Sequence, residues 1–245
     1  MNERGVSDVV GYVLVFSLIV ATVGVVTVTG FGTLEDRRTA EQINNAERAL
    51  DVFANNVENL YRDGAPSRAT EMRLSGGTLR YGEPVNITVA DATDPAINNT
   101  VQMTPLVYSE GEAEIIYVGG AVLRSDRGST VMLRNPPFRI GSERSLIPLI
   151  QTTDFPGVTS VSVDGTVRIT ATAVGRTAVP EPALSEAEEI RLNVSSPRDE
   201  VWEGYFDQLQ ADIGGNVTNG EEVSYTFKTE ELSAPQYRIQ LRLHR

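Results

Sequence analysis

The chain has 245 residues, 33 acidic and 21 basic, which gives a formal net charge of -12 at pH 7. This excess of negative charge argues against nucleic acid as the main partner, because binding to phosphate groups needs a basic patch. The chain has no cysteine, which excludes disulfides and thiolate metal sites. Its single histidine, His244, is next to the C-terminus, so an enzyme would have to use carboxylates, hydroxyls, tyrosine or arginine.

The basic residues are almost all arginine, and Lys228 is the only lysine. An acidic surface with little lysine is typical of a protein that stays soluble in concentrated salt, where repulsion between carboxylates is screened. A GC-rich genome would also replace lysine by arginine. The net charge favours the first interpretation, a halophilic source.

Residues 9–32 form an uncharged, largely apolar stretch of 24 residues. A helix needs about 20 apolar residues to cross a bilayer, and lipid makes helix nearly obligatory because the backbone must satisfy its own hydrogen bonds. A Sec-type cleaved signal peptide would have a shorter apolar region followed by a small-x-small cleavage site. We therefore expect a retained transmembrane helix over residues 6–34, in preference to a cleaved signal peptide or a buried core helix.

An amphipathic pattern follows over residues 35–62. Its apolar residues alternate at spacings of three and four: Ile43, Ala46, Leu50, Phe53, Val57 and Leu60. This stripe predicts a helical extension that packs either on the chain's own C-terminal domain or on neighbouring copies. Asp63 and Gly64, followed by Pro66, predict its end.

The period of the apolar residues changes to two from Thr70 onward, which predicts a β-rich domain over residues 66–245. We expect one hairpin turn at residues 75–77 and another at Asp164-Gly165, which joins strands 158–163 and 166–174. Further strands are predicted over residues 85–89, 101–108, 113–118, 121–124, 130–134, 146–151, 189–194, 223–228 and 237–243. The expected fold class is α+β, with a mainly antiparallel, β-sandwich-like domain.

One extra helix is predicted at about residues 197–213. Ser196 would be its N-cap and Pro197 its first residue. Its apolar stripe, which we expect to pack on a sheet, consists of Trp202, Phe206, Leu209 and Ile213. The preceding segment, residues 175–189, is the best candidate for a long loop or linker.

The sequence contains no Gly-rich phosphate-binding loop, no nucleophile elbow and no EF-hand pattern. Carboxylates are frequent, for example in residues 110–114, but an acidic surface produces such runs by default. We therefore assign no catalytic, cofactor-binding or metal-ligating residue, and expect a protein that is not an enzyme and needs no cofactor.

Four Asn-x-Ser/Thr sequons make candidate N-glycosylation sites, at Asn86, Asn98, Asn193 and Asn216. Their use would require the domain after the apolar stretch to lie outside the cell. The few charges that flank the apolar stretch do not decide its orientation.

The N-terminus, ERGVSDVVGY at residues 3–12, resembles the type III signal peptide and N-terminal helix of archaeal type IV pilins and pilin-like proteins, especially those of halophilic archaea. The resemblance implies that a prepilin peptidase removes residues 1–5. Arg4 and Gly5 would end this leader peptide, and Val6 would be the first mature residue. Many haloarchaeal pilins have proline at the position of Asp8, so the match supports export and anchoring more strongly than filament assembly.

A second similarity lies in the β-rich domain. The segments IYVGGAVLR at residues 116–124 and VMLRNPP at residues 131–137 look like an uncharacterised haloarchaeal family with the same pilin-type start. This similarity implies family membership without an activity.

These resemblances imply a non-enzymatic, pilin-like protein in the cell membrane, single-pass, with its C-terminal domain extracellular. Its expected partners are the membrane, a prepilin peptidase and other pilin subunits, which would contact its N-terminal helix in a surface filament for adhesion. The alternative is a monomeric, membrane-anchored extracellular binding protein that does not polymerise. An anchored hydrolase that uses carboxylates is a third, weaker hypothesis.

Overall fold

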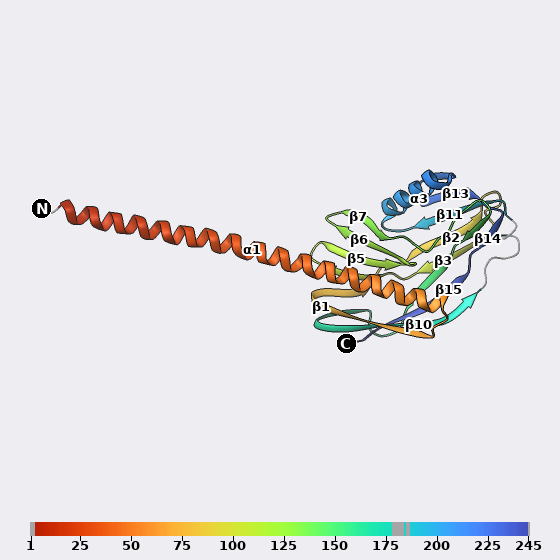
Figure 1. The fold of residues 1–245 in the computed structure, drawn as a ribbon, viewed down its shortest axis with the longest axis horizontal. Helices are drawn as coiled ribbons and strands as arrows, with labels where there is room; N and C mark the ends of the chain where they lie inside the picture. Colours follow the sequence, from red (N-terminus) through yellow and green to blue (C-terminus); the bar gives the residue numbers. More distant parts are fainter. Residues whose placement is uncertain (1–2, 178–183, 185–186, 245) are drawn as a thin grey trace. The chain divides into compact units, whose positions relative to one another are not determined.

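The computed structural model describes residues 3–177, 184 and 187–244, with side chains for all of these except residues 3–8, 28–36 and 75. Its first element is the helix α1 (Glu3–Arg62), which ends where the sequence predicts (Figure 1). The chain divides into two compact units, Met1–Glu41 and Gln42–Arg245.

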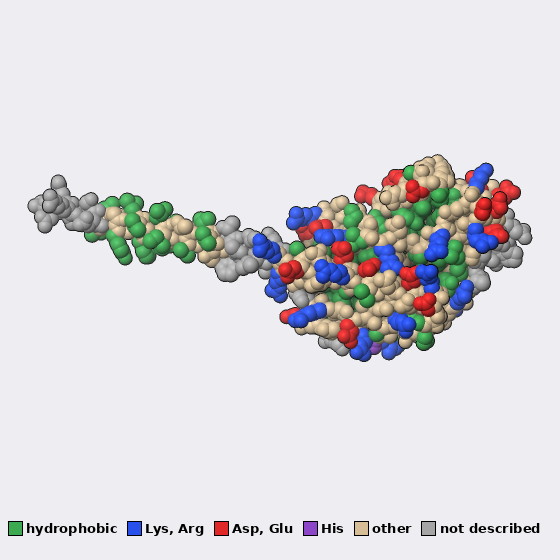
Figure 2. All heavy atoms as spheres, in the orientation of Figure 1, with side chains coloured by type: hydrophobic (Ala, Val, Ile, Leu, Met, Phe, Trp, Pro, Cys, Tyr) green, Lys and Arg blue, Asp and Glu red, His purple; other side chains and the backbone are tan. Residues whose placement is uncertain are grey.

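The first unit contains an apolar helical segment, Val9–Thr27, whose 19 residues are long enough to cross a membrane. Figure 2 shows its hydrophobic side chains on the surface, and none of the segment is buried. Its threonine hydroxyls bond within the helix: Thr22 donates to the carbonyl oxygen of Leu18 at 2.8 Å, and Thr27 to that of Val23 at 2.7 Å. Because these hydroxyls are satisfied internally, the segment suits an environment without water.

The second unit contains two large sheets, a two-stranded sheet and the helix α3 (Asp199–Ile213). The eight-stranded sheet has the order β7-β6-β5-β4-β1-β10-β15-β9. Its strands are β1 (Ser67–Tyr81), β4 (Leu106–Glu110), β5 (Ala113–Val118), β6 (Ala121–Asp126), β7 (Ser129–Arg134), β9 (Leu149–Asp154), β10 (Ser160–Thr177) and β15 (Gln236–His244).

The five-stranded sheet has the order β12-β13-β11-β2-β3. Its strands are β2 (Val85–Asp91), β3 (Asn98–Met103), β11 (Glu189–Ser195), β12 (Asn216–Asn219) and β13 (Val223–Lys228). The short strands β8 (Arg144–Leu146) and β14 (Glu231–Ser233) form the two-stranded sheet. Only β15–β9 and β14–β8 are parallel among the described pairs, so the expected α+β class with mainly antiparallel strands is confirmed.

The amphipathic part of α1 packs on the chain's own domain. All six residues of the predicted stripe are buried, from Ile43 to Leu60, and they share one core with the eight-stranded sheet. At the centre of this contact the ring of Phe53 meets the ring of Tyr117 edge-on, with centroids 4.9 Å apart. The structure therefore confirms packing within the chain over this length of the helix.

Three neighbouring strands of the eight-stranded sheet, β4, β5 and β6, have buried residues on both faces. In β5, Ile115 and Tyr117 lie in the core shared with α1, whereas Ile116 and Val118 lie in the core shared with the five-stranded sheet. This double burial explains why residues 115–118 of β5 are all apolar and do not alternate with polar residues.

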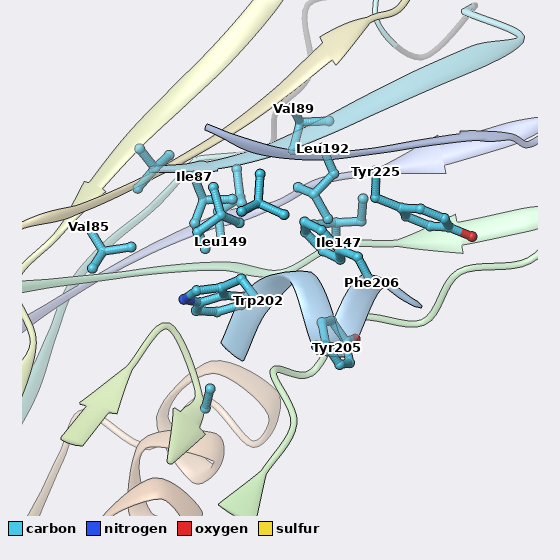
Figure 3. Packing of buried hydrophobic residues seen from close by; sticks show 14 of the residues in the cluster. Val85, Ile87, Val89, Ile147, Leu149, Leu192, Trp202, Tyr205, Phe206 and Tyr225 are labelled. Atoms are coloured by element: carbon cyan, nitrogen blue, oxygen red, sulfur yellow. The ribbon is translucent and has the colours of Figure 1, made fainter. Parts of the chain in front are cut away.

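The second core lies between the two large sheets and α3 (Figure 3). Trp202 and Phe206 are fully buried in it, and the Phe206 ring stacks on Tyr225 with centroids 5.7 Å apart. The predicted stripe is thus confirmed for its first half. Leu209 is only partly buried, and Ile213 is exposed.

The start of α3 differs from the prediction. The helix begins at Asp199 after Arg198, and the Ser196 hydroxyl oxygen accepts a hydrogen bond from the Arg198 amide at 3.1 Å. Ser196 therefore stabilises the turn before the helix and is not its N-cap.

Both predicted hairpin turns are wrong, because β1 and β10 are long, continuous and paired with each other. The two turn-like sequences lie opposite one another in this pairing, with Ser75 facing Asp164 at a local irregularity in the register. Packing explains why position 77 is a glycine, because a Cβ there would lie 2.4 Å from the ring of the buried Tyr108. These glycines therefore mark a bulge and a close contact, and not a chain reversal.

Two predicted strands are each divided by a proline. Residues 101–108 split into β3 and β4 around Pro105, and residues 146–151 split into β8 and β9 around Pro148. Proline has no amide hydrogen to donate to a ladder, so the chain leaves one sheet and enters another at these points. The short strands β12 and β14 were not predicted from the sequence.

The loop predicted over residues 175–189 starts later than expected, because β10 continues to Thr177. Residues 178–183 and 185–186 of this prediction lie outside the described residues.

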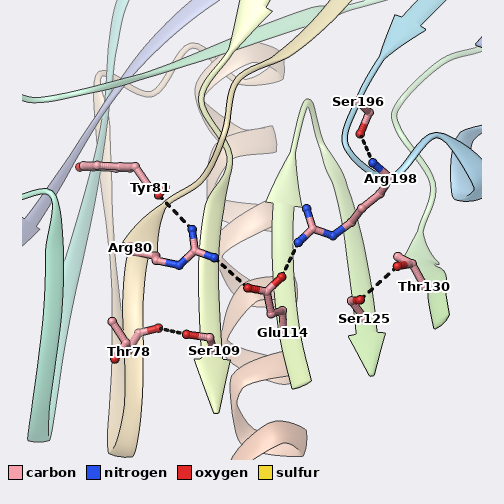
Figure 4. A network of polar contacts seen from close by, with 9 residues as sticks. All are labelled: Thr78, Arg80, Tyr81, Ser109, Glu114, Ser125, Thr130, Ser196 and Arg198. Carbon is pink, nitrogen blue, oxygen red and sulfur yellow. Dashed lines mark hydrogen bonds and ion pairs between the residues drawn. The ribbon is translucent and has the colours of Figure 1, made fainter. Parts of the chain in front are cut away.

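A carboxylate ties the eight-stranded sheet to the segment that leads into α3 (Figure 4). Glu114 on β5 accepts a hydrogen bond from Arg80 on β1 at 2.8 Å, and its other oxygen is paired with Arg198. The Glu114 side chain is only 21% exposed, so this bridge is better shielded from water than an ordinary surface ion pair.

We expect Gly77→Ala to destabilise the protein by about 1–3 kcal/mol, because the added methyl group overlaps the Tyr108 ring. The matched control is Gly165→Ala on the paired strand, where a Cβ meets no atom within 4 Å. Denaturant unfolding of the full chain in detergent measures both changes. Equal stability of the two variants would contradict the packing role of Gly77.

We expect Glu114→Gln to lower the free energy of unfolding by about 1–2 kcal/mol, since it weakens two charge-assisted hydrogen bonds at once. Glu112→Gln is the control, because that side chain is 80% exposed and lies 3.8 Å from Arg127. The control should stay within about 0.5 kcal/mol of the unmodified protein. An equally large loss of unfolding free energy in the control would show a general effect of charge, and would contradict the specific role of Glu114.

Candidate functional site

The residues of the predicted cleavage site lie at the start of α1. The helix begins at Glu3, so Arg4, Gly5 and Val6 are within its first turns. Their side chains are outside the described part of the structure. Cleavage after Gly5 therefore stays a prediction.

The four sequons, in contrast, gather on one face of the five-stranded sheet. Side chains alternate between the two faces of a strand, so the asparagine and the Ser/Thr two residues later share a face. The strand register places Thr88 beside both Asn193 and Thr100, and it places Asn216 beside Thr226. We call the face opposite the core the polar sheet face; it includes Asn86, Thr88, Asn98, Thr100, Gln102, Asn193, Ser195, Asn216, Thr218, Ser224 and Thr226.

The four asparagines differ in accessibility. Asn216 is exposed on the edge strand β12, and no hydrogen bond of its side chain is found among the described residues. Asn98 is exposed on β3, but its amide nitrogen donates to the carbonyl oxygen of Pro95 at 2.9 Å. Asn86 is half-buried on β2. Asn193 lies on the central strand β11, and its side-chain oxygen is buried without a hydrogen-bond partner among the described protein groups.

A second candidate site, which the sequence analysis missed, is a pocket of about 510 Å³ in the second unit. We call it the arginine pocket, because four arginines line it together with a single carboxylate, Glu58. The arginines are Arg62 at the end of α1, Arg134 at the end of β7, Arg139 between β7 and β8, and Arg176 near the end of β10.

Two of these arginines belong to the framework of the pocket. Arg134 donates to Asp51 at 3.0 Å, to Asn55 at 2.7 Å and to Glu58 at 2.8 Å, all on α1. The second oxygen of Glu58 is paired with Arg62. These contacts hold one wall of the pocket against the helix.

The other two arginines have no carboxylate partner among the described residues. Arg139 is exposed, and the Arg176 guanidinium lies 5.2 Å from the centroid of the Tyr237 ring. The Tyr237 ring is in turn 5.3 Å from the Tyr61 ring. Burial and then the charge of Glu58 raise the pKa of Tyr61 to about 12, so its phenol stays neutral at ordinary pH.

Among the described residues no group of three His, Asp or Glu side chains could hold a metal ion. The guanidinium groups instead suit anions, which they bind through paired hydrogen bonds. Sequence reasoning missed the pocket because its arginines are far apart in the chain and share no spacing.

The fold and these sites define an α+β protein with an N-terminal helix long and apolar enough to span a membrane and a mainly antiparallel β domain. The chain belongs to a family of unknown function, DUF7289, whose model matches residues 4–242. No curated protein and no solved structure matches the chain. The family match includes both the apolar segment and the strands of the β domain.

We expect N-glycans on Asn216 and Asn98 and an unmodified Asn193, because only the first two asparagines are exposed. Mass spectrometry of peptides from the native protein measures the occupancy of each site. Asn216→Gln should remove one glycan, and Asn219→Gln, an exposed asparagine of the same strand outside any sequon, should remove none. A glycan on Asn193 together with an unmodified Asn216 would contradict the expected order of glycosylation.

Proposed function

We propose that the protein is a non-enzymatic, pilin-like surface subunit. A prepilin peptidase removes residues 1–5, α1 anchors the mature chain in the cell membrane, and the β domain lies outside the cell. The observation that carries the proposal is the division of α1 into two lengths. The apolar stripe over residues 43–60 is buried in the core of the β domain. The apolar segment Val9–Thr27, in contrast, is not buried by any other part of the chain.

An uncovered apolar length of this size is unstable in water. Large side chains there are more than half exposed, for example Leu14 at 65% and Leu18 at 68%. Burial of each such side chain contributes roughly 1.5–3 kcal/mol. Lipid can cover the segment, and so can the same segment of other copies, which would make one surface serve first as an anchor and then as the contact of a filament.

The resemblance of residues 3–12 to archaeal pilins adds the processing step to this proposal. The family match begins at residue 4, beside the proposed cleavage site. The net charge of the chain, -12, suits an extracellular and saline environment.

A monomeric, membrane-anchored binding protein is the second candidate, and the arginine pocket favours it. A subunit that only builds a fibre has no need of a lined pocket. Packing between copies would also be confined to the N-terminal length of α1, because the stripe over residues 43–60 is already buried.

We expect the native, membrane-bound protein to begin at Val6, and to keep residues 1–5 in cells that lack the prepilin peptidase. Mass spectrometry of the N-terminus measures this directly. Sedimentation of sheared surface material then separates the two candidates: filaments that contain the chain support the pilin-like subunit, and detergent-soluble monomers alone support the binding protein. An intact N-terminus in cells with the peptidase would overturn the processing step.

Leu18→Arg tests the anchor, because arginine at the centre of a membrane helix costs roughly 2.5–3.5 kcal/mol. We expect more of this variant in the soluble fraction after cell lysis. Leu133→Arg makes the same substitution at an exposed position of β7, 41% exposed, and should leave the distribution unchanged. Equal membrane retention of both variants would contradict the anchor.

A further inference from the structure

The arginine pocket is locally positive, although the protein as a whole has a negative net charge. The chain carries a net charge of -12, yet the pocket is lined by four guanidinium groups and one carboxylate. Even when Asp51, which is paired with Arg134, is counted, the cations outnumber the carboxylates by two. In an acidic protein such a concentration of positive charge attracts anions to this part of the surface.

Two of the cations are free to meet a ligand. Arg134 and Arg62 are paired with carboxylates of α1, whereas Arg139 and Arg176 have no such partner among the described residues. Arg176 is also partly fixed, since its guanidinium rests on the Tyr237 ring. A guanidinium held in place before binding loses less conformational freedom when an anion arrives.

The remaining walls are aromatic and uncharged. Tyr61, Tyr237 and Phe138 line the pocket, and the two tyrosine rings contact each other. Neither tyrosine hydroxyl has a hydrogen-bond partner among the described residues, so both can donate to and accept from a ligand. The Glu58 oxygens and the Asn135 amide add acceptors close by.

We propose that the arginine pocket binds an acidic sugar, a uronic acid residue, whose carboxylate is held by Arg139 and Arg176 and whose ring lies against Tyr61. A carboxylate matches the fork of a guanidinium. The apolar face of a pyranose stacks on an aromatic ring, and its hydroxyls match the phenols and the Glu58 carboxylate. The pocket volume of about 510 Å³ lies in the range of sites for small ligands.

An acidic peptide fits these walls less well. Its carboxylates would use the arginines, but its extended backbone would leave the tyrosine rings and their hydroxyls without partners. The inference concerns the β domain alone, and it holds whether or not the chain assembles into filaments.

Titration calorimetry on the full chain in detergent tests the inference. The probes are galacturonate, a short oligogalacturonate, neutral galactose and hexaglutamate. We expect galacturonate and its oligomer to bind at least about tenfold more tightly than galactose, because galactose lacks the carboxylate. Binding of the monomer supports recognition of one free sugar acid, and binding of the oligomer alone supports recognition within a polysaccharide. Hexaglutamate that binds as tightly as the uronates would overturn the sugar assignment.

Arginine variants distinguish binding in the pocket from a general effect of positive charge on anion binding. Arg139→Gln and Arg176→Gln should each weaken uronate binding at least about tenfold, and Arg176→Lys should give an intermediate loss because it keeps the charge without the fork. Arg168→Gln on β10 is the control, since that arginine is exposed and paired with Glu71 at 3.0 Å outside the pocket. Thermal unfolding checks that all variants fold. Equal affinity of the pocket variants and the control would overturn the proposal.

Discussion

The contact between residues 43–60 of α1 and the eight-stranded sheet is the constraint on which the rest of the second unit depends. Strands β4, β5 and β6 of this sheet have apolar residues on both faces, and the five-stranded sheet with α3 covers only one of these faces. Without the helix, Ile115 and Tyr117 would face water. Six helix residues, each at most 4% exposed, cover these side chains, so the helix is part of the domain core. The same contact also fixes the wall of the arginine pocket, because Arg134 is held by carboxylates and an amide of the last turns of α1.

Much of the fold could be predicted from the sequence where the pattern is local. The stripe of α1 and the buried residues Trp202 and Phe206 follow from apolar periodicity, and strand β5 follows from a short continuous apolar run. The errors lie where one residue type has two physical uses. The glycines at positions 76 and 77 suggest a turn, but Gly77 provides room for a tyrosine ring that lies some thirty positions further along the chain. The tertiary contact decided the outcome, and it leaves no local signal.

The candidate sites show the same limit. A three-residue motif identifies each sequon, yet their common position on the polar sheet face depends on the pairing of β11 with both β2 and β13. Local exposure, which decides whether Asn193 or Asn216 is accessible, follows from the strand order and could not be seen beforehand. The arginine pocket has no signature in the sequence, because Arg134 contacts residues of α1 that are 76 or more positions away in the chain.

One consequence of the shared core concerns the order in which the chain is made. Ile43 lies in the same cluster as Ile239, Leu241 and Leu243 of β15, so the two ends of the second unit complete each other. During synthesis the apolar stripe of α1 emerges early and must wait for almost two hundred further residues before its partners exist. Folds dominated by contacts between distant residues form slowly and expose apolar surface meanwhile. A chain that crosses a membrane as it is made would thus finish folding only on the far side, after its last strand has arrived.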